Sequence, residues 1–294
     1  MKIGIGIGSL ERWGDDRYKK LKEHGFSCID YNMMGTDYFP YCDSLEVTKE
    51  RLLKEKQLAD EAGVEIYQVH GPWHWPPNDT TKELRDQKLE HVKRSLWAAS
   101  VLGCKHWVIR ATKVLGCSLW VIHPIMPCGI NERDTDEAQI TFDINLDFMR
   151  KALSIAKEYG ITICLENMPM RNFCLATPYN ILNFVKLIND ENFKICLDTG
   201  HVATFPELDV AKAVVDLGSE IRAFHIHDSF PDRDLHLLPY FGTINWKDFS
   251  TALKSIDYKG GICLETAPPH ALPNDLYEEL CISLAKIMKI ITND

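Results

Sequence analysis

Short strand-like segments alternate with helix-like segments along the whole chain, and this alternation restricts the fold more than any other feature of the sequence. The strand-like segments are rich in Ile, Val and Cys, and they cover residues 2–7, 27–31, 65–70, 119–123, 161–166, 193–198, 221–227 and 261–265. Between them, apolar residues recur at three- and four-residue steps, as expected for amphipathic helices. Eight strand–helix units in succession predict parallel strands that close into an α/β fold of the (β/α)8 TIM barrel type.

The sequence shows no obvious boundary between domains. No linker-like stretch rich in Pro, Ser or Gly divides the 294 residues, so we expect a single domain over 1–294 rather than two doubly wound domains. Glycines at 25, 63, 160 and 260 stand just before predicted strands, where left-handed residues commonly end helices.

One local irregularity interrupts the pattern. The segment VLGCKHWVI at 101–109 recurs as VLGCSLWVI at 114–122, so 101–122 is an apparent local duplication. We interpret the second copy as the fourth strand because it leads directly into His123 and Pro124. The first copy is then either additional helix or an inserted loop.

Composition favours a cytoplasmic protein that acts on a small molecule. Asp and Glu number 42 against 33 Lys and Arg, which gives a net charge of -9, and no basic face for nucleic acid is evident. No apolar segment approaches the roughly 20 residues that span a bilayer, and the N-terminus becomes polar too early for a signal peptide. The ten cysteines form no CxxC pair, and Cys164, Cys196 and Cys263 lie inside strand-like segments, so we expect buried thiols in a reducing compartment.

Histidines and carboxylates stand at or just after the ends of the predicted strands. They are His70, His123, Glu166, Asp198, His201, His225, Asp234, His236 and Glu265. The C-terminal ends of barrel strands meet at the active face, so we expect these side chains to share one rim. So many polar groups do not suit an apolar core, and a bound divalent metal would account for them. Imidazole with carboxylate suits Zn, Mn or Co.

Two further features point to a ligand pocket. A loop rich in Trp and Pro follows the third strand. It is either a packed loop or one in which Trp73 forms the wall of a sugar pocket by stacking. Arg233 is a candidate contact for a phosphate or carboxylate, with a plain surface charge as the alternative. His227 and Asp228, which follow the seventh strand, are candidates to support the site from behind.

The motifs VHGPW, VIHP, LENMP, LDTGH, HIHDS, DLHLLPYFGTINW and LET together resemble those of the xylose isomerase-like barrel superfamily. The resemblance covers nearly the whole chain. It implies that Glu166, Asp198, His225 and Glu265 bind one catalytic metal. It also implies that Glu166 and Glu265 transfer the proton and that His201 contacts the substrate. We add His70, Trp73 and Arg233 as expected substrate contacts.

The resemblance implies a divalent-metal-dependent sugar or sugar-phosphate isomerase or epimerase that works through an enediolate. Two alternatives from the same superfamily are a dehydratase and a zinc phosphodiesterase of the endonuclease IV type, whose trinuclear zinc set resembles all nine strand-end residues. In that case His70, His123, His201, Asp234 and His236 would hold a second or third metal. The net charge of -9 counts against DNA as substrate. A noncatalytic metal-binding barrel is the third alternative. Similar chains form dimers or tetramers, and by this analogy we expect a homo-oligomer.

Overall fold

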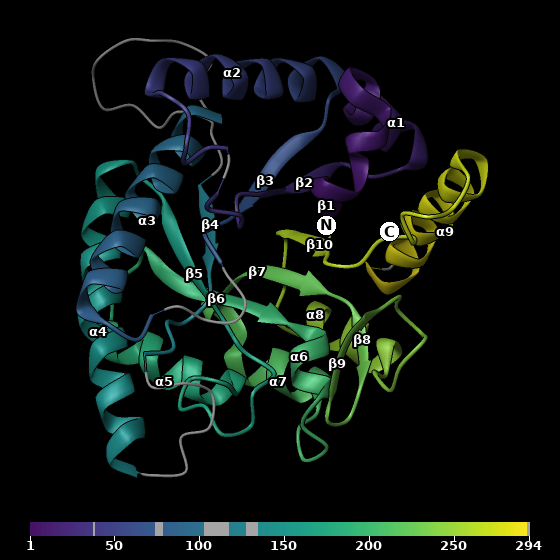
Figure 1. The fold of residues 1–294 in the computed structure, drawn as a ribbon. Helices are drawn as coiled ribbons and strands as arrows, with labels where there is room; N and C mark the ends of the chain where they lie inside the picture. The colour runs from purple at the N-terminus through teal and green to yellow at the C-terminus, as the bar shows by residue number, and fades with distance from the viewer. Residues whose placement is uncertain (38, 74–78, 103–117, 128–134, 293–294) are drawn as a thin grey trace.

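Eight parallel strands close into a barrel, as the sequence predicts. The computed structural model describes residues 1–37, 39–73, 79–102, 118–127 and 135–292. The barrel strands are β1 (Lys2–Gly6), β2 (Cys28–Asn32), β3 (Glu65–His70), β4 (Leu119–Ile122), β5 (Thr162–Glu166), β6 (Phe193–Asp198), β7 (Ile221–Ile226) and β10 (Gly261–Leu264). They are hydrogen-bonded in the order β1-β10-β7-β6-β5-β4-β3-β2, with β1 also paired to β2 (Figure 1). All eight predicted strands are confirmed, with ends that differ by one residue at most.

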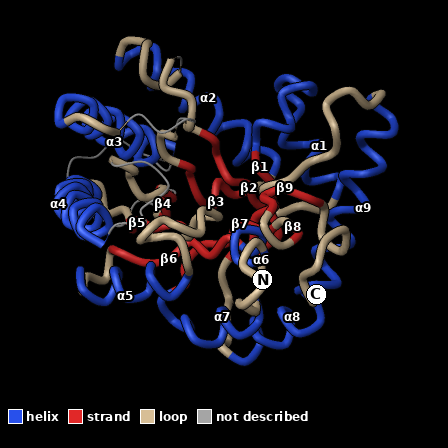
Figure 2. The backbone as a smooth tube through the Cα atoms, turned by 60° about the horizontal axis from the view of Figure 1, so that its bottom comes forward, coloured by secondary structure: helices blue, strands red, loops and turns tan. Residues whose placement is uncertain are grey.

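Helices surround the barrel on its outside (Figure 2). They are α1 (Arg17–His24), α2 (Leu45–Ala62), α3 (Lys82–Leu102), α4 (Thr135–Glu158), α5 (Pro178–Ile188), α7 (Val210–Leu217), α8 (Trp246–Ser255) and α9 (Asn274–Thr292), with a short α6 (Thr199–Ala203) and the 3-10 segments η1 (Ile7–Asp16) and η2 (Gly218–Glu220). Local sequence explains several boundaries. The Thr177 hydroxyl and the Asn180 side chain form a reciprocal capping box at the start of α5. None of the described helices combines the length and the apolar character that a bilayer crossing requires.

The predicted helix-ending glycines are confirmed at three positions and wrong at the fourth. Gly25, Gly63 and Gly160 have positive φ, whereas the residue with positive φ after α8 is Asp257. Gly260 serves a different need. A Cβ there would lie 2.5 Å from the hydroxyl oxygens of both Tyr67 and Tyr258, so the close approach of these rings excludes a larger residue.

The core has an outer layer between strands and helices and a smaller cluster on the opposite faces of neighbouring strands. Trp120, Phe184 and Phe224 are fully buried in the outer layer. The smaller cluster comprises Val121, Cys164, Cys196 and Ala223. Cys164, Cys196 and Cys263 are buried and free, so the predicted burial of these thiols is confirmed. In the 101–122 repeat, the second copy does contain β4, while residues 103–117 lie outside the described residues.

A two-stranded antiparallel hairpin follows the seventh barrel strand, and the sequence did not predict it. It consists of β8 (Asp228–Phe230) and β9 (Arg233–Leu237). Asp234 and His236, expected in a loop, are therefore on a strand. Successive side chains of a strand point to opposite faces, so the spacing of two residues places both on the same face.

A buried carboxylate anchors the segment after this hairpin. Asp228 Oδ1 accepts hydrogen bonds from the backbone N–H groups of Ser229 (2.9 Å) and Ile244 (3.1 Å). Asp228 Oδ2 accepts from the backbone N–H of Tyr240 (3.0 Å) and from the indole N–H of Trp246 (2.9 Å). Four donors around one fully buried carboxylate fix the path of the chain from the hairpin to α8.

We expect Asp228→Asn to lower the free energy of unfolding by about 2–4 kcal/mol, because the amide NH2 replaces an oxygen that accepts two hydrogen bonds. Urea denaturation of both proteins measures the difference. Asp216→Asn is the matched control, since Asp216 forms an exposed ion pair with Lys212 within α7 and should change the free energy by less than about 0.5 kcal/mol. Equal effects of the two substitutions would contradict the anchoring role.

Candidate active site

The C-terminal ends of the barrel strands bring the predicted polar residues together. Glu166, Asp198 and His70 are the last residues of their strands, and His123 and Glu265 directly follow theirs. Most of these side chains are buried, and Glu166 and Asp198 have no exposed surface at all. Because parallel strands all end on the same side, side chains that are far apart in the sequence become neighbours here.

Four of these residues form a compact set that we call the central group: Glu166, Asp198, His225 and Glu265. Each offers a nitrogen or oxygen atom, and these four atoms all lie within 4.8 Å of one another. His225 Nδ1 lies 2.9 Å from Glu166 Oε1 and 3.2 Å from Glu265 Oε2. The central group has the same members as the predicted ligand set for one metal.

His70 and His123 lie beside the central group, next to Glu166. Glu166 Oε2 is 3.0 Å from His123 Nε2 and 3.7 Å from His70 Nε2. The His70 ring also stacks on the His225 ring, with centroids 5.5 Å apart. Glu166 is therefore shared between the central group and these two histidines.

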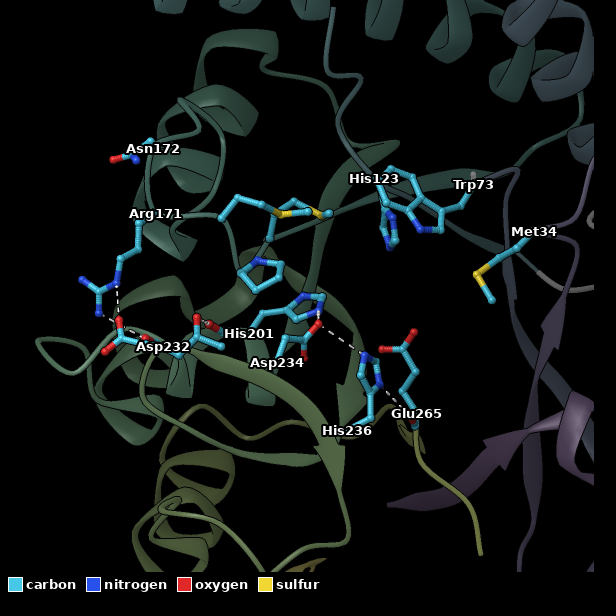
Figure 3. Close-up of a pocket in the computed structure, with 14 residues that line it drawn as sticks. Met34, Trp73, His123, Arg171, Asn172, His201, Asp232, Asp234, His236 and Glu265 are labelled. Carbon is cyan, nitrogen blue, oxygen red and sulfur yellow. Dashed lines mark hydrogen bonds and ion pairs between the residues drawn. The ribbon is translucent and has the colours of Figure 1, made fainter. Parts of the chain in front are cut away.

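A second set, which we call the rim group, consists of His201, His227, Asp234 and His236. Asp234 Oδ2 lies 3.5 Å from the Nε2 atoms of both His201 and His236 (Figure 3). His227 stacks on His236 with ring centroids 4.0 Å apart, and its Nε2 lies 3.0 Å from Asp198 Oδ1. His227 thus connects the rim group to the central group. The sequence pattern HIH is consistent with this position. Residues two apart on a strand point to the same face, so His227 is directed to the same side of the sheet as His225.

Gly200 allows His227 to reach this position. A Cβ at residue 200 would lie 1.9 Å from the His227 ring, so no side chain fits there. The glycine of the LDTGH motif therefore serves a close approach between α6 and the end of β7.

Several histidines of the site have one ring nitrogen fixed by a backbone carbonyl. The Nδ1 atoms of His70, His201 and His236 donate to the carbonyl oxygens of Gly71, Asn167 and Glu265, at 2.9, 2.7 and 3.0 Å. In each ring this leaves Nε2 facing the carboxylates. His225 has the opposite arrangement, with Nδ1 toward the carboxylates and Nε2 bonded to Asp30.

Sequence reasoning missed three residues of the site. Asn167 exchanges two hydrogen bonds with the backbone of Asp198 and so extends the β5–β6 pairing. Asp30, on β2, accepts from His225. Arg171 lines the cavity described below. Two features of the sequence could have identified them: Asn167 directly follows Glu166, and Asp30 is the single acid within an apolar strand.

The carboxylates and histidines change one another's protonation. Burial lowers the pKa of His201, but Asp198, Asp234 and Glu166 outweigh it and raise the pKa to about 10. Burial also lowers the pKa of His236, but Asp234 and Glu265 outweigh it and raise the pKa to about 9. Although burial acts to raise the pKa of Glu166, His225 and His123 hold it well below its usual range. The site therefore favours positive charge among its carboxylates.

The residues of the central group fit a divalent cation. The Oε2 atoms of Glu166 and Glu265 are buried, and neither accepts a well-directed hydrogen bond from a described residue, although His123 Nε2 and His225 Nδ1 lie 3.0 and 3.2 Å away. Buried carboxylate oxygens without donors are unfavourable unless a cation compensates them. Two Glu, one Asp and one His form a mixed oxygen and nitrogen set, which suits Zn, Mn or Co.

A cavity of about 810 Å³ lies over both groups. His123, His201, Asp234, His236 and Glu265 line it, together with an apolar wall of Met34, Trp73, Met168, Pro169 and Met170. In Figure 3, Trp73 and Met34 lie at one end and Arg171 with Asp232 at the other. Trp73 thus stands where the sequence predicts a wall, while residues 74–78 of its loop lie outside the described residues.

The two arginines near the cavity differ in position. Arg233 is exposed at the start of β9 and is not among the described residues that line the cavity. Arg171 lines it, and its guanidinium donates to Asp232 Oδ1 (2.8 Å) and to the carbonyl oxygen of Thr204 (3.2 Å).

Comparison with known proteins places this site in a family. Residues 18–286 match the family model described as the xylose isomerase-like TIM barrel. An uncharacterized protein of Methanocaldococcus jannaschii is 28% identical over 269 residues, covering 90% of this chain and 83% of that one. A D-psicose 3-epimerase of Enterocloster bolteae is 25% identical over 267 residues, covering 90% and 82%. The crystal structure of a D-tagatose 3-epimerase-like protein superimposes with a TM-score of 0.74 at 26% identity, covering 100% and 97%.

We expect the metal-free protein to lose stability as the pH rises from about 6.5 to about 10. His201 has a pKa of about 10 in the folded state against 6.5 for an ordinary histidine. A group with a raised folded-state pKa stabilises the fold fully below its unfolded pKa, and this contribution disappears as the pH passes the folded pKa. Thermal unfolding in the presence of a chelator, at pH values across this range, measures the effect.

His201→Gln is the control for other groups that titrate in the same range, and it should make the decrease shallower. A saturating divalent cation should also reduce it, because metal binding displaces protons from histidines. If wild type and His201→Gln lose stability in parallel, the charged form of His201 does not stabilise the fold.

Proposed function

The chain belongs to the xylose isomerase-like TIM barrel family, and from this premise and the geometry of the site we propose that it is a divalent-metal-dependent sugar isomerase or epimerase. The observation that carries the proposal is that two carboxylates, Glu166 and Glu265, lie 2.9 and 3.2 Å from one imidazole nitrogen, His225 Nδ1. A cavity of about 810 Å³ accommodates a monosaccharide. The relative from Enterocloster bolteae is a D-psicose 3-epimerase, and since psicose is a ketose, this supports a ketose as the substrate.

In this proposal Glu166, Asp198, His225 and Glu265 hold the cation. When bound, it would supply Lewis-acid polarisation of a carbonyl and stabilise negative charge on oxygen. The assignment agrees with the buried Oε2 atoms of Glu166 and Glu265, which accept no well-directed hydrogen bond.

The two glutamates would transfer the proton. One carboxylate removes the proton from the carbon next to the carbonyl, and the electron pair of the C–H bond forms the enediolate. Protonation of the opposite face of the same carbon by the second carboxyl group gives the epimer. Protonation of the neighbouring carbon gives the isomer.

His201, Trp73 and His70 would orient the sugar. The His201 Nδ1–H is occupied by the carbonyl oxygen of Asn167, so Nε2 is the atom that can contact a substrate oxygen. Trp73 provides an aromatic surface for the apolar face of a sugar ring or chain. His70 is nearly buried beside Glu166, so its contact with the substrate would be limited to Nε2. We retain Arg233 as a contact only for a substrate long enough to reach the hairpin.

We expect Glu166→Gln and Glu265→Gln each to lower the turnover of D-psicose or L-ribulose by a factor of about 10²–10⁴, because an amide cannot accept the proton. Incorporation of deuterium from D2O into the sugar, followed by NMR, reports the proton transfer directly. Glu220→Gln is the matched control, since Glu220 pairs with Lys194 at the far end of the barrel. Full deuterium exchange by Glu166→Gln with metal bound would exclude that carboxylate as the base.

Metal analysis of the purified protein tests the cation. We expect about one Zn, Mn or Co per chain, loss of activity on chelation, and recovery when the same ion is added back. An activity that is unchanged after complete removal of metal would contradict the proposal. Release of water from the sugar in place of epimerisation would identify a dehydratase of the same family.

A zinc phosphodiesterase is the second candidate. In the rim group, and also in the set of His70, Glu166 and His225, the ligand atoms lie within 4.8 Å of one another, so each set could hold a further ion. Two or three Zn per chain would favour it. Cleavage of a DNA duplex with an abasic site, with a rate that falls steeply as salt increases, is the decisive test.

A further inference from the structure

We propose that Asp30 is a positioning residue that fixes the ring and the tautomer of His225 and so presents Nδ1 to the central group. This inference rests on the proposed function, since it gives Asp30 a role in preparing the cation site.

The contacts of Asp30 are few and specific. The residue lies on β2, its side chain is 8% exposed, and its Oδ2 is 2.9 Å from His225 Nε2. Gln68 Nε2 donates to the same oxygen at 3.0 Å. One end of the His225 ring is thus held by a carboxylate, while the other end faces Glu166 and Glu265.

This arrangement decides which nitrogen of His225 can bind a cation. A carboxylate oxygen only accepts hydrogen bonds, so Nε2 must carry the proton that it donates to Asp30. Nδ1 is the nitrogen that faces the central group, 2.9 Å from Glu166 Oε1. It is therefore the atom whose lone pair a cation would use, after displacing the proton that Nδ1 shares with that carboxylate. A carboxylate behind a ligating histidine also strengthens the histidine as a ligand.

Asp30 differs from the groups that fix the other histidines of the site. His70, His201 and His236 donate to backbone carbonyl oxygens, which any residue could supply. His225 is fixed by a charged side chain, so a single substitution can remove the contact.

The fold by itself gives no reason for a carboxylate at this position. Asp30 Oδ1 is buried and accepts no hydrogen bond within the described part of the chain, and the same holds for the neighbouring Gln68 Oε1. Among the described residues, Asp30 forms no ion pair with a lysine or an arginine, and its one charged partner is His225. Two residues earlier on the same strand, the chain has an apolar Cys28. A buried carboxylate with one uncompensated oxygen is unfavourable for folding, and its contact with His225 provides the reason for its presence.

The test measures Co²⁺ affinity by competition with a chelator, together with the visible absorption of the bound ion. We expect Asp30→Leu to weaken Co²⁺ binding by a factor of about 10–100 and to alter the absorption bands. Asp30→Asn keeps an oxygen that can accept the hydrogen bond from Nε2, so it should weaken Co²⁺ binding by less than about tenfold. This variant replaces Asp30→Leu in the test if the Leu variant does not fold. Cys28→Ala, on the same strand, should leave the affinity within about twofold of wild type.

The outcomes separate this inference from the proposed function. Wild-type Co²⁺ affinity and spectrum in both Asp30 variants would overturn the role of Asp30 and leave the proposed function intact. Weakened binding in the variants of a protein that turns over no ketose would support Asp30 and refute the sugar substrate. A wild-type chain that binds no Co²⁺, Mn²⁺ or Zn²⁺ would overturn both.

Discussion

Buried negative charge at the C-terminal end of the barrel is the constraint on which the rest of the site depends. Asp30, Glu166 and Asp198 are each 6% exposed or less. A buried carboxylate needs a hydrogen-bond donor or a positive charge close by. Histidine meets this need in three ways, because it can donate a hydrogen bond, carry a proton, or bind a cation that satisfies several carboxylates together. The imidazoles around the central group follow from that requirement.

Barrel geometry determines which carboxylates and histidines meet. Asp198 on β6 is directly opposite His225 on β7, whereas Glu166 on β5 is opposite Cys196, two residues before Asp198. This stagger follows from the tilt of strands in a closed barrel. It moves successive strand ends around the rim, so that residues from β5, β6, β7 and the end of β10 converge on one point.

The sequence predicts those parts of the structure that depend on local pattern. Strand–helix alternation identifies all eight barrel strands, and the histidines and acids at strand ends identify nine candidates that include the central group. The family resemblance selects the four members of that group. Asp30 and Arg171 were missed because their roles depend on contacts across the barrel and the cavity, with His225 at a sequence separation of 195 and with Asp232 at 61. The hairpin was missed because short polar strands such as RDLHL have no apolar alternation strong enough to distinguish them from a loop.

The two polar groups differ in how firmly the fold holds them, and this difference bears on their chemistry. Residues of the central group lie on or directly after barrel strands, so hydrogen bonds along the sheet fix their backbone. Asp234 and His236 of the rim group lie on the hairpin, with side chains 28% and 40% exposed. Their strand, β9, pairs with β8, which begins at Asp228, and His236 is held further by its contact with the carbonyl oxygen of Glu265. Electrostatic stabilisation of developing charge requires groups that do not reorganise during the reaction. The central group meets that requirement because all its members lie on or directly after barrel strands, whereas in the rim group His201 and His227 are buried and only Asp234 and His236 depend on the hairpin.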